Sequence, residues 1–176
     1  MDLAHEATST QKYSRLAKDK NAMKDMAALL GETIAKHPFT ADMKPEHLKV
    51  LTSAAMFKRF ERDEVIFKEG DPANRFYLIC HGKVALESRR NAETAPVVQL
   101  VGEDETLGWS WLFPPYYWHF DARAIEPTEA IFFYGARLRE ECEADPALGY
   151  DMMKRVAAIV IKRLQIARVQ LLQSQP

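Results

Sequence analysis

The sequence predicts a mainly β fold with flanking helices, in which a β-jelly-roll is followed by a long carboxyl-terminal helix. Helical periodicity is confined to the two ends of the chain. The middle consists of short apolar runs separated by turn signals. Runs this short and this evenly spaced are typical of an antiparallel sandwich or barrel, whereas alternating βαβ units would place long helical segments between the strands.

The first part of the chain predicts helix. Its apolar residues recur at helical spacing among Lys, Asp and Glu; they are Tyr13, Leu16, Met23, Met26, Ala27, Leu29, Leu30 and Ile34. The pair His37-Pro38 ends this pattern, since the residue before a proline avoids the helical region. We therefore expect residues 1–37 to form a helical extension. A second helix is predicted at Pro45–Ala55, because proline suits the first turn of a helix.

The central domain is expected over residues 38–144. Six strands are predicted there: Glu64–Lys68, Phe76–Cys80, Val84–Glu87, Pro96–Val101, Ala122–Ile125 and Ala130–Tyr134. Gly70-Asp71-Pro72 predicts a turn after the first of them. His81-Gly82 is interpreted as a hairpin turn between the second and third strands.

The helical period returns after Gly135. Arg137–Glu143 predicts a short charged helix, and Asp145-Pro146 begins another over residues 145–172, with aspartate as cap and proline in the first turn. Apolar residues lie three or four positions apart along one stripe of this last helix: Met153, Val156, Val160, Leu164, Ala167 and Leu171.

This last helix predicts a homodimer. At about 27 residues it is about 40 Å long, more than one small domain covers. The stripe is most simply covered by the same helix of a second subunit. The alternative is that the stripe packs entirely on its own β-domain and on the amino-terminal helix. Arg163 lies outside the apolar stripe of this helix.

The composition favours a folded protein and disfavours a disordered, nucleic-acid-binding or membrane-spanning one. A hydrophobic fraction of 47% and a charged fraction of 28% are those of a folded chain and not of a disordered one. A net charge of −1 disfavours direct nucleic-acid binding, which needs a concentrated basic surface. No apolar run predicts a membrane span or a signal peptide. We expect a cytoplasmic protein without a membrane partner, whose Cys80 and Cys142 are not paired in a disulfide.

Residues 62–84, RDEVIFKEGDPANRFYLICHGKV, resemble the cyclic-nucleotide-binding domain family. Catabolite activator/FNR regulators, the regulatory subunits of cyclic-AMP-dependent kinase and cyclic-nucleotide-gated channels belong to it. The shared pattern is an apolar strand, then E-G-D, a second apolar strand with an aromatic residue, and a turn glycine. Gly70 and Gly82 suit tight turns with positive φ, and Asp63 stands where the family usually has glycine. The resemblance covers about residues 38–165.

The resemblance implies a ligand-binding cassette with the pattern G-E-x-A/G-L, several residues, then R-S/T-A. In that pattern the glutamate binds the ribose hydroxyl and the arginine pairs with the cyclic phosphate. The matching segment is Gly108–Ala124, in which Gly108, Leu112 and Ala124 fall in place. The candidate ligand-binding residues are therefore Gly108, Trp109, Ser110, Trp111, Leu112, Trp118, His119, Phe120, Asp121, Ala122 and Arg123.

The chemistry of this cassette departs from the pattern. Trp109 stands in the place of the glutamate, and residues 118–120 are aromatic in the region of the arginine. Loss of a bidentate arginine–phosphate pair, about 3–5 kcal/mol, weakens binding about 10²- to several-thousand-fold. A cyclic nucleotide is thus a disfavoured ligand, and no cofactor is assigned. Arg123 leaves two alternatives open: it substitutes for the missing arginine, or it pairs with Asp121, which precedes it by two residues on a predicted strand and shares its face.

Three interpretations of the cassette remain open. Seven of the twelve residues from Trp109 to Phe120 are aromatic. In the first, the rings fill the cavity and leave no ligand site. In the second, they stack on a flat or apolar ligand other than a cyclic nucleotide. In the third, they accommodate a true cyclic nucleotide.

Catalysis and metal binding are not predicted. Residues 108–112 begin like a nucleophile elbow but lack its closing glycine, and the five histidines show no metal-ligand spacing. Only four residues follow the long helix, so we expect no DNA-recognition helix.

The function expected is a stand-alone regulatory or sensor module for a small ligand other than a cyclic nucleotide, or for none. The alternatives are a true cyclic AMP or GMP regulator and a ligand-free dimeric interaction or scaffold module.

Overall fold

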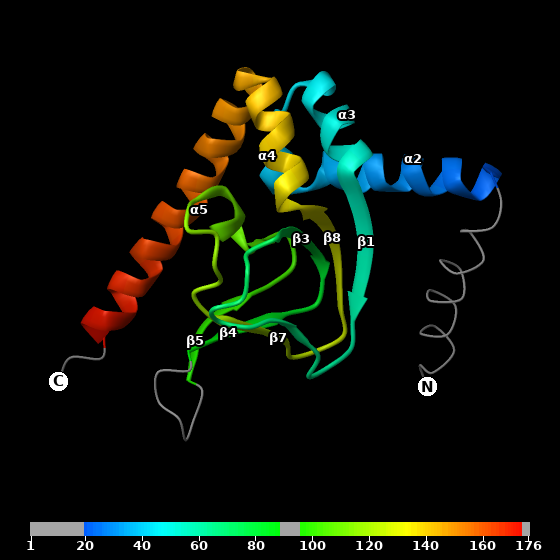
Figure 1. The fold of residues 1–176 in the computed structure, drawn as a ribbon. Helices are drawn as coiled ribbons and strands as arrows, with labels where there is room; N and C mark the ends of the chain where they lie inside the picture. Colours follow the sequence, from blue (N-terminus) through cyan, green and yellow to red (C-terminus); the bar gives the residue numbers. More distant parts are fainter. Residues whose placement is uncertain (1–19, 89–95, 174–176) are drawn as a thin grey trace, which may run out of the picture.

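The computed structural model describes residues 20–88 and 96–173, which form two facing antiparallel sheets with helices packed over one of them (Figure 1). The helices and 3-10 turns are α2 (Lys20–Lys36), η1 (Pro38–Thr40), α3 (Pro45–Ala54), η2 (Trp109–Leu112), α4 (Gly135–Ala144) and α5 (Pro146–Gln173). The strands are β1 (Ala55–Phe60), β2 (Val65–Phe67), β3 (Arg75–His81), β4 (Val84–Glu87), β5 (Val97–Val101), β6 (Thr106–Leu107), β7 (Asp121–Ala124) and β8 (Thr128–Tyr134).

The two sheets have the strand orders β1-β8-β3-β6 and β2-β7-β4-β5. Every pairing is antiparallel, and strands distant in sequence lie next to one another, as when Phe76 of β3 pairs with Phe133 of β8. Such crossed pairing between two packed sheets is the jelly-roll architecture.

The inner faces of the two sheets enclose one apolar core. Its buried members are Phe60, Tyr77, Ile79, Val84, Leu86, Val101, Leu107, Ala122, Ala124, Ala130 and Phe132. Alternate residues of β7 contribute to it, since side chains of a strand point to opposite faces in turn.

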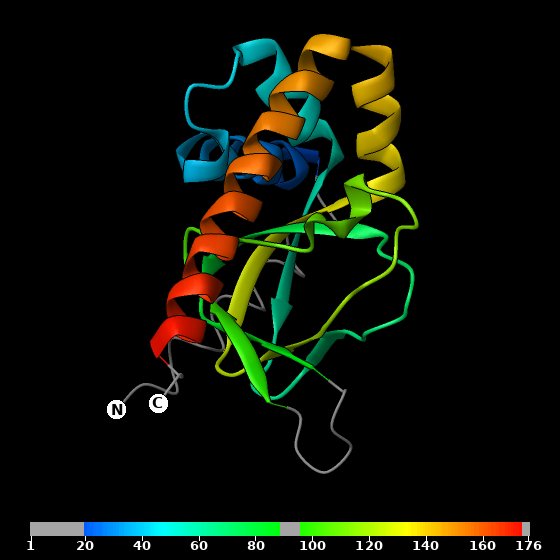
Figure 2. The ribbon, with the colours of Figure 1, turned by 90° about the vertical axis from the view of Figure 1, so that its left-hand side faces the viewer.

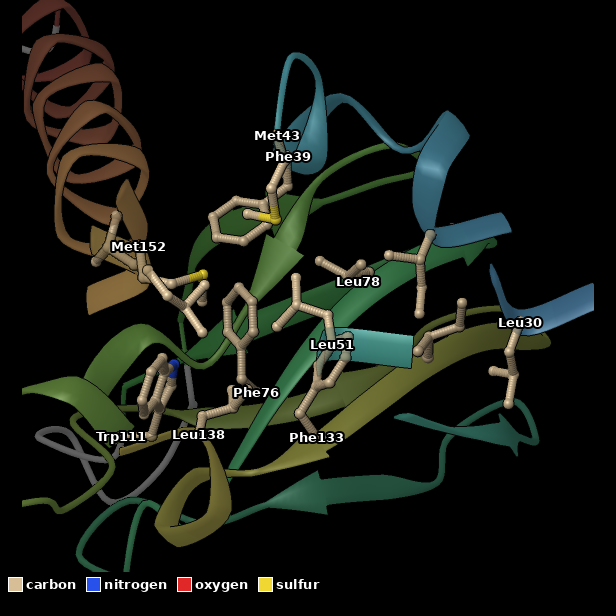
Figure 3. Close-up of a cluster of buried hydrophobic side chains, with 14 residues drawn as sticks. Leu30, Phe39, Met43, Leu51, Phe76, Leu78, Trp111, Phe133, Leu138 and Met152 are labelled. Atoms are coloured by element: carbon tan, nitrogen blue, oxygen red, sulfur yellow. The ribbon is translucent and has the colours of Figure 1, made fainter. Parts of the chain in front are cut away.

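A second core lies between the other face of the first sheet and the helices (Figure 3). Phe76 and Leu78 of β3 and Phe133 of β8 point into it, where they meet Leu51 of α3 and Met152 of α5. Both faces of this sheet are therefore covered, which explains why the β3 sequence is a continuous apolar run instead of an alternating one.

α5 runs from the helical layer down along the sandwich, and its far end lies beside the edge formed by β5 (Figure 2). Asp145 caps it: the carboxylate accepts hydrogen bonds from the backbone N–H of Ala147 (2.9 Å) and Leu148 (3.3 Å). These bonds, with a smaller contribution from His47, lower the pKa of Asp145. The first half of α5 is anchored in the helical core, and every residue from Leu164 to Gln173 is exposed.

The predicted fold class is confirmed, and so are the helix from Pro45, the capped helix from Asp145-Pro146 and all six predicted strands to within two residues. The prediction of a hairpin at His81-Gly82 is wrong. Gly82 does make a turn with φ 89°, but β3 and β4 belong to different sheets, because the turn carries the chain from one layer to the other.

Two strands were missed. β1 is a half-buried strand at the edge of its sheet, in which Lys58 and Arg59 interrupt the apolar residues, and its first residue lies in the segment predicted as helix. β6 has only two residues, too few for an apolar run. The part of the predicted amino-terminal helix before Lys20 lies outside the described residues. Among the helices of residues 20–88 and 96–173, none is both long and apolar enough to cross a membrane.

Candidate ligand site

The cassette begins with a left-handed glycine. Gly108 follows β6 with φ 87°, and a Cβ atom at this position would lie 2.9 Å from Cη2 of Trp118 and 3.1 Å from the carbonyl oxygen of Arg75. An L-residue is disfavoured by both the backbone angle and the missing space. The glycine thus brings the 3-10 turn η2 and the indole of Trp118 into direct contact.

Trp118 lies under this turn. It is 4% exposed, and its ring stacks on Phe67 of β2 with the ring centroids 3.9 Å apart and an interplanar angle of 14°. Its backbone is fixed as well, because its N–H donates to the carbonyl of Asp71 (3.0 Å) and its own carbonyl accepts from the N–H of Gly70 (2.9 Å). Both the ring and the backbone of Trp118 are therefore held against the sandwich.

Trp111 lies on the opposite side of the turn. It is fully buried in the helical core near Phe76, and its carbonyl accepts a 2.6 Å hydrogen bond from Nη1 of Arg139 on α4. Leu112 packs against the same core. These two candidate residues anchor the cassette in the helical core.

A cavity of about 280 Å3 opens between the cassette, the β2-β7-β4-β5 sheet and α5. We call it the ring-lined cavity. The cassette residues that line it are Gly108, Trp109, Ser110, Trp118, His119 and Phe120. Phe67, Leu86 and Leu107 add apolar wall, and α5 closes one side with Val160, Arg163, Leu164 and Ala167. Ligand cavities usually measure about 300–1,000 Å3, and this cavity lies just below that range, which restricts it to a small molecule.

The remaining candidate residues do not line this cavity. Ala122 lies in the core between the sheets. Arg123 is on the outer face of β7, where its guanidinium pairs with the carboxylates of Glu87 and, at 3.0 Å, Asp63. Hydrogen bonding to Glu87 is the main cause that raises the pKa of Arg123.

The expected partnership of Arg123 with Asp121 is replaced by these two ion pairs. The Oδ1 atom of Asp121 accepts a 2.7 Å hydrogen bond from the N–H of Glu69. The two residues share a face of β7, as predicted, but partners from neighbouring strands and loops lie closer to each of them.

The charged residue in the wall of the ring-lined cavity comes from α5. Arg163 is half-buried, and its Nη2 donates a 2.6 Å hydrogen bond to the carbonyl of Thr106 on β6. Burial lowers the pKa of this guanidinium, and the charge of Glu105 opposes that effect. Among the described residues that line the cavity, Arg163 carries the single permanent charge.

The position of Arg163 at the cavity follows from helical spacing along α5. Helical geometry places residues three and four apart on the same face, so Val160, Arg163 and Ala167 face the cavity together. Arg163 borders the apolar stripe of α5 and is not remote from it.

A second cavity of about 320 Å3 lies on the other side of Arg163, between η1, the loop before β6 and α5. Arg163 and Asp104 both belong to its lining. Its other charged side chains are engaged: Arg155 donates to the carbonyls of Phe39 (2.7 Å) and Ala41 (2.8 Å), and Lys162 lies 3.7 Å from Glu105. Unlike the ring-lined cavity, this second cavity has a wall that carries charges of both signs.

The described part of the chain offers no metal site and no reactive thiol. No cluster of three or more His, Cys, Asp or Glu side chains with metal-binding geometry occurs within residues 20–88 and 96–173. Both cysteines are free, and burial raises the pKa of Cys80 and of Cys142 to about 11. A thiol with so high a pKa stays protonated near neutral pH and is a poor nucleophile.

Comparison with known proteins identifies relatives of this architecture. The sequence profile of the cyclic nucleotide-binding domain matches residues 57–145. A CRP-like cAMP-activated global transcriptional regulator of Mycobacterium tuberculosis is 23% identical over 128 residues, which are 73% of this chain. Those residues make up 57% of the regulator, so the chain spans little more than half of that relative's length.

Solved structures agree with the fold. A candidate cyclic nucleotide-binding protein of Geobacter metallireducens GS-15 is 34% identical and superposes with a TM-score of 0.70 over 76% of this chain and 97% of its own. The regulatory subunit of a cAMP-independent protein kinase A from Trypanosoma brucei, 20% identical, superposes with a TM-score of 0.61 over 76% of this chain and 49% of its own.

Proposed function

The chain belongs to the cyclic nucleotide-binding domain family, and we propose that it is a ligand-sensing module whose ring-lined cavity takes a small flat molecule other than a cyclic nucleotide. One observation carries the proposal: the cavity lies between the cassette and α5, and both contribute to its wall. A molecule in that position contacts the cassette and the long helix at the same time.

The aromatic wall defines the chemistry of the ligand. Indole and phenyl faces from Trp109, Trp118 and Phe120 favour a planar molecule, which they bind by offset stacking or edge-to-face contact. The outward position of Arg123 supports a ligand other than a cyclic nucleotide, because this arginine is occupied by Glu87 and Asp63 on the far side of the sheet.

Signal transfer follows from the place of α5. Its first half is packed in the helical core, whereas its second half begins at the cavity and is exposed. A ligand that binds one orientation of this half more tightly than another shifts the population toward that orientation. The output of the module is then the position of the exposed half.

Two matched variants of α5 test the site. Ala167 lines the ring-lined cavity and Ala158 lines the second cavity, and both are exposed on the same helix. With 2-naphthylmethanol as a neutral planar probe, titrated by saturation-transfer NMR, we expect Ala167→Phe to weaken binding at least about tenfold, because the added ring occupies the cavity. Ala158→Phe should bind the probe like the unmodified protein.

The alternative is a ligand-free dimeric interaction module. It is favoured by the stack of Trp118 on Phe67, which fills the space beneath the cassette. Native mass spectrometry of the purified protein separates the two functions, since a sensor yields a retained ligand mass or binds the naphthyl probe. A dimer that retains no mass and ignores the probe would overturn the sensor proposal.

The module is also proposed to form a homodimer through α5. Its 28 residues make a helix about 42 Å long. Four members of the apolar stripe are exposed: Ala167, and Met153, Leu164 and Leu171, which are 42%, 68% and 63% exposed. A second copy of the same helix covers this stripe by a two-fold interface, and the net charge of −1 opposes such pairing only weakly.

A further inference from the structure

Arg163 is a half-buried cation at the wall of the ring-lined cavity. One hydrogen bond fixes it, from Nη2 to the carbonyl of Thr106. A guanidinium has five N–H donors, and no other hydrogen bond from Arg163 to the described residues is recorded. The remaining donors are therefore available to a molecule in either of the two cavities that Arg163 lines, and the ring-lined cavity is the one with an aromatic wall.

The nearby carboxylate does not take up these donors. Glu105 acts on Arg163 through its charge, but its carboxylate accepts a 2.9 Å hydrogen bond from the N–H of Gly102 and lies 3.7 Å from Nζ of Lys162. A half-buried cation without a close counterion is unfavourable, and an anion that enters the cavity offsets that cost.

Resting on the proposed function, we infer that the ligand of the ring-lined cavity is a planar aromatic anion whose carboxylate, sulfonate or phosphate group pairs with Arg163. The aromatic wall binds the ring, and the guanidinium binds the anionic group in the fork geometry that suits such oxygens. The charged contact thus comes from α5, and the cassette supplies only aromatic and backbone surface.

In this arrangement the bound anion connects α5 to the cavity wall that continues from β6. Arg163 is already tied to β6 through Thr106, and residues 107–110 continue from that strand into the cavity wall. A bound anion adds a second bridge at the same point. It therefore stabilises the orientation of α5 in which Arg163 reaches β6.

A pair of probes that differ only in charge tests this inference. We expect 2-naphthoate to bind the unmodified protein more tightly than 2-naphthylmethanol by about 10- to 100-fold at low salt, the range expected for a charge-assisted contact. Isothermal titration calorimetry at 50 mM and 500 mM NaCl should find that this preference shrinks at high salt, because the contact is ionic.

Arg163→Gln should remove the preference, so that 2-naphthoate and 2-naphthylmethanol bind this variant with equal affinity, since glutamine keeps an N–H donor for Thr106 without the charge. Arg155→Gln is the matched control: Arg155 is the other half-buried arginine of α5 that donates to backbone carbonyls, and it lines only the second cavity. That variant should bind both probes normally.

The outcomes separate the inference from the proposed function. Equal binding of the two probes, or a preference that survives Arg163→Gln, overturns the role of Arg163 and leaves the sensor intact. Binding of neither probe, or binding that survives Ala167→Phe, overturns both.

Discussion

At the scale of single residues, two glycines with the same backbone angle have different roles. Gly70 (φ 88°) has open space where a Cβ would stand, whereas at Gly108 (φ 87°) the Cβ would press on Trp118 and on the carbonyl of Arg75. Gly70 therefore provides conformational freedom alone. Gly108 provides both that freedom and the close packing that forms the floor of the ring-lined cavity.

The comparison of Gly70→Ala with Gly108→Ala separates these two effects. Gly70→Ala should lower the free energy of unfolding by about 1–2 kcal/mol, the cost of a left-handed L-residue. Gly108→Ala should add the overpacking against Trp118, about 1–3 kcal/mol more. Urea denaturation followed by circular dichroism measures both, and equal losses would contradict the packing role of Gly108.

At the scale of elements, α5 consists of two parts with different surroundings. Its first part is buried by α3, α4 and the first sheet, through Leu148, Met152 and Val156. Its second part carries apolar side chains in contact with solvent, and β5 beside it exposes Val97 and Leu100 as well. An apolar surface formed by neighbouring elements is typical of a protein–protein interface.

Two pairs of substitutions on α5 test the dimer. Leu164→Glu with Leu171→Glu places two charges on the exposed stripe, and we expect the dimer to dissociate into monomers in sedimentation velocity experiments, because like charges would face each other across the two-fold axis. Ile166→Glu with Val169→Glu adds the same charges to other faces of the same helical turns and should leave the mass unchanged. A monomeric unmodified protein, or equal effects of the two pairs, would exclude the stripe as the interface.

At the scale of the whole molecule, His37 joins the amino-terminal helices to the sandwich. It is 4% exposed, and its Nδ1 accepts a 3.1 Å hydrogen bond from the N–H of Phe39. Burial lowers the pKa of His37 below its ordinary 6.5, against the opposing charge of Asp104 and the carbonyls of Ile79 and Glu105. The ring is therefore neutral in the folded state at neutral pH.

This histidine makes stability depend on pH. Because the pKa is lower in the folded state, the unfolded chain binds the proton more tightly. The free energy of unfolding is then highest above pH 6.5 and falls as the pH drops from there toward the folded-state pKa.

His37→Asn should flatten this dependence. Asparagine still offers an acceptor to Phe39 but does not titrate, so the loss of stability between pH 7.5 and 5.5 should be smaller than in the unmodified protein. Urea denaturation at the two pH values measures it, with the exposed His81→Asn as control. If His37→Asn and His81→Asn lose stability equally on acidification, His37 is not the group responsible.

The predicted architecture could be obtained from the sequence because its signals are local. Apolar runs, Gly70, Pro45 and the Asp145-Pro146 pair each fix a nearby backbone conformation, whatever the distant parts of the chain do. The strands of the jelly roll and the start of α5 followed from such signals. β1 and β6 did not, since their pairing with β8 and β3 is set by partners far along the chain.

The sequence by itself determined the jelly-roll domain, its long carboxyl-terminal helix and the aromatic character of the cassette. Only the tertiary structure decided which rings face the cavity, that Trp111 and Trp118 lie on opposite sides of η2, and that Arg163 stands in the wall. The reason is physical: a 3-10 turn of four residues has no long-range period, and the contact of Arg163 with Thr106 joins residues 57 positions apart, which sequence spacing does not encode.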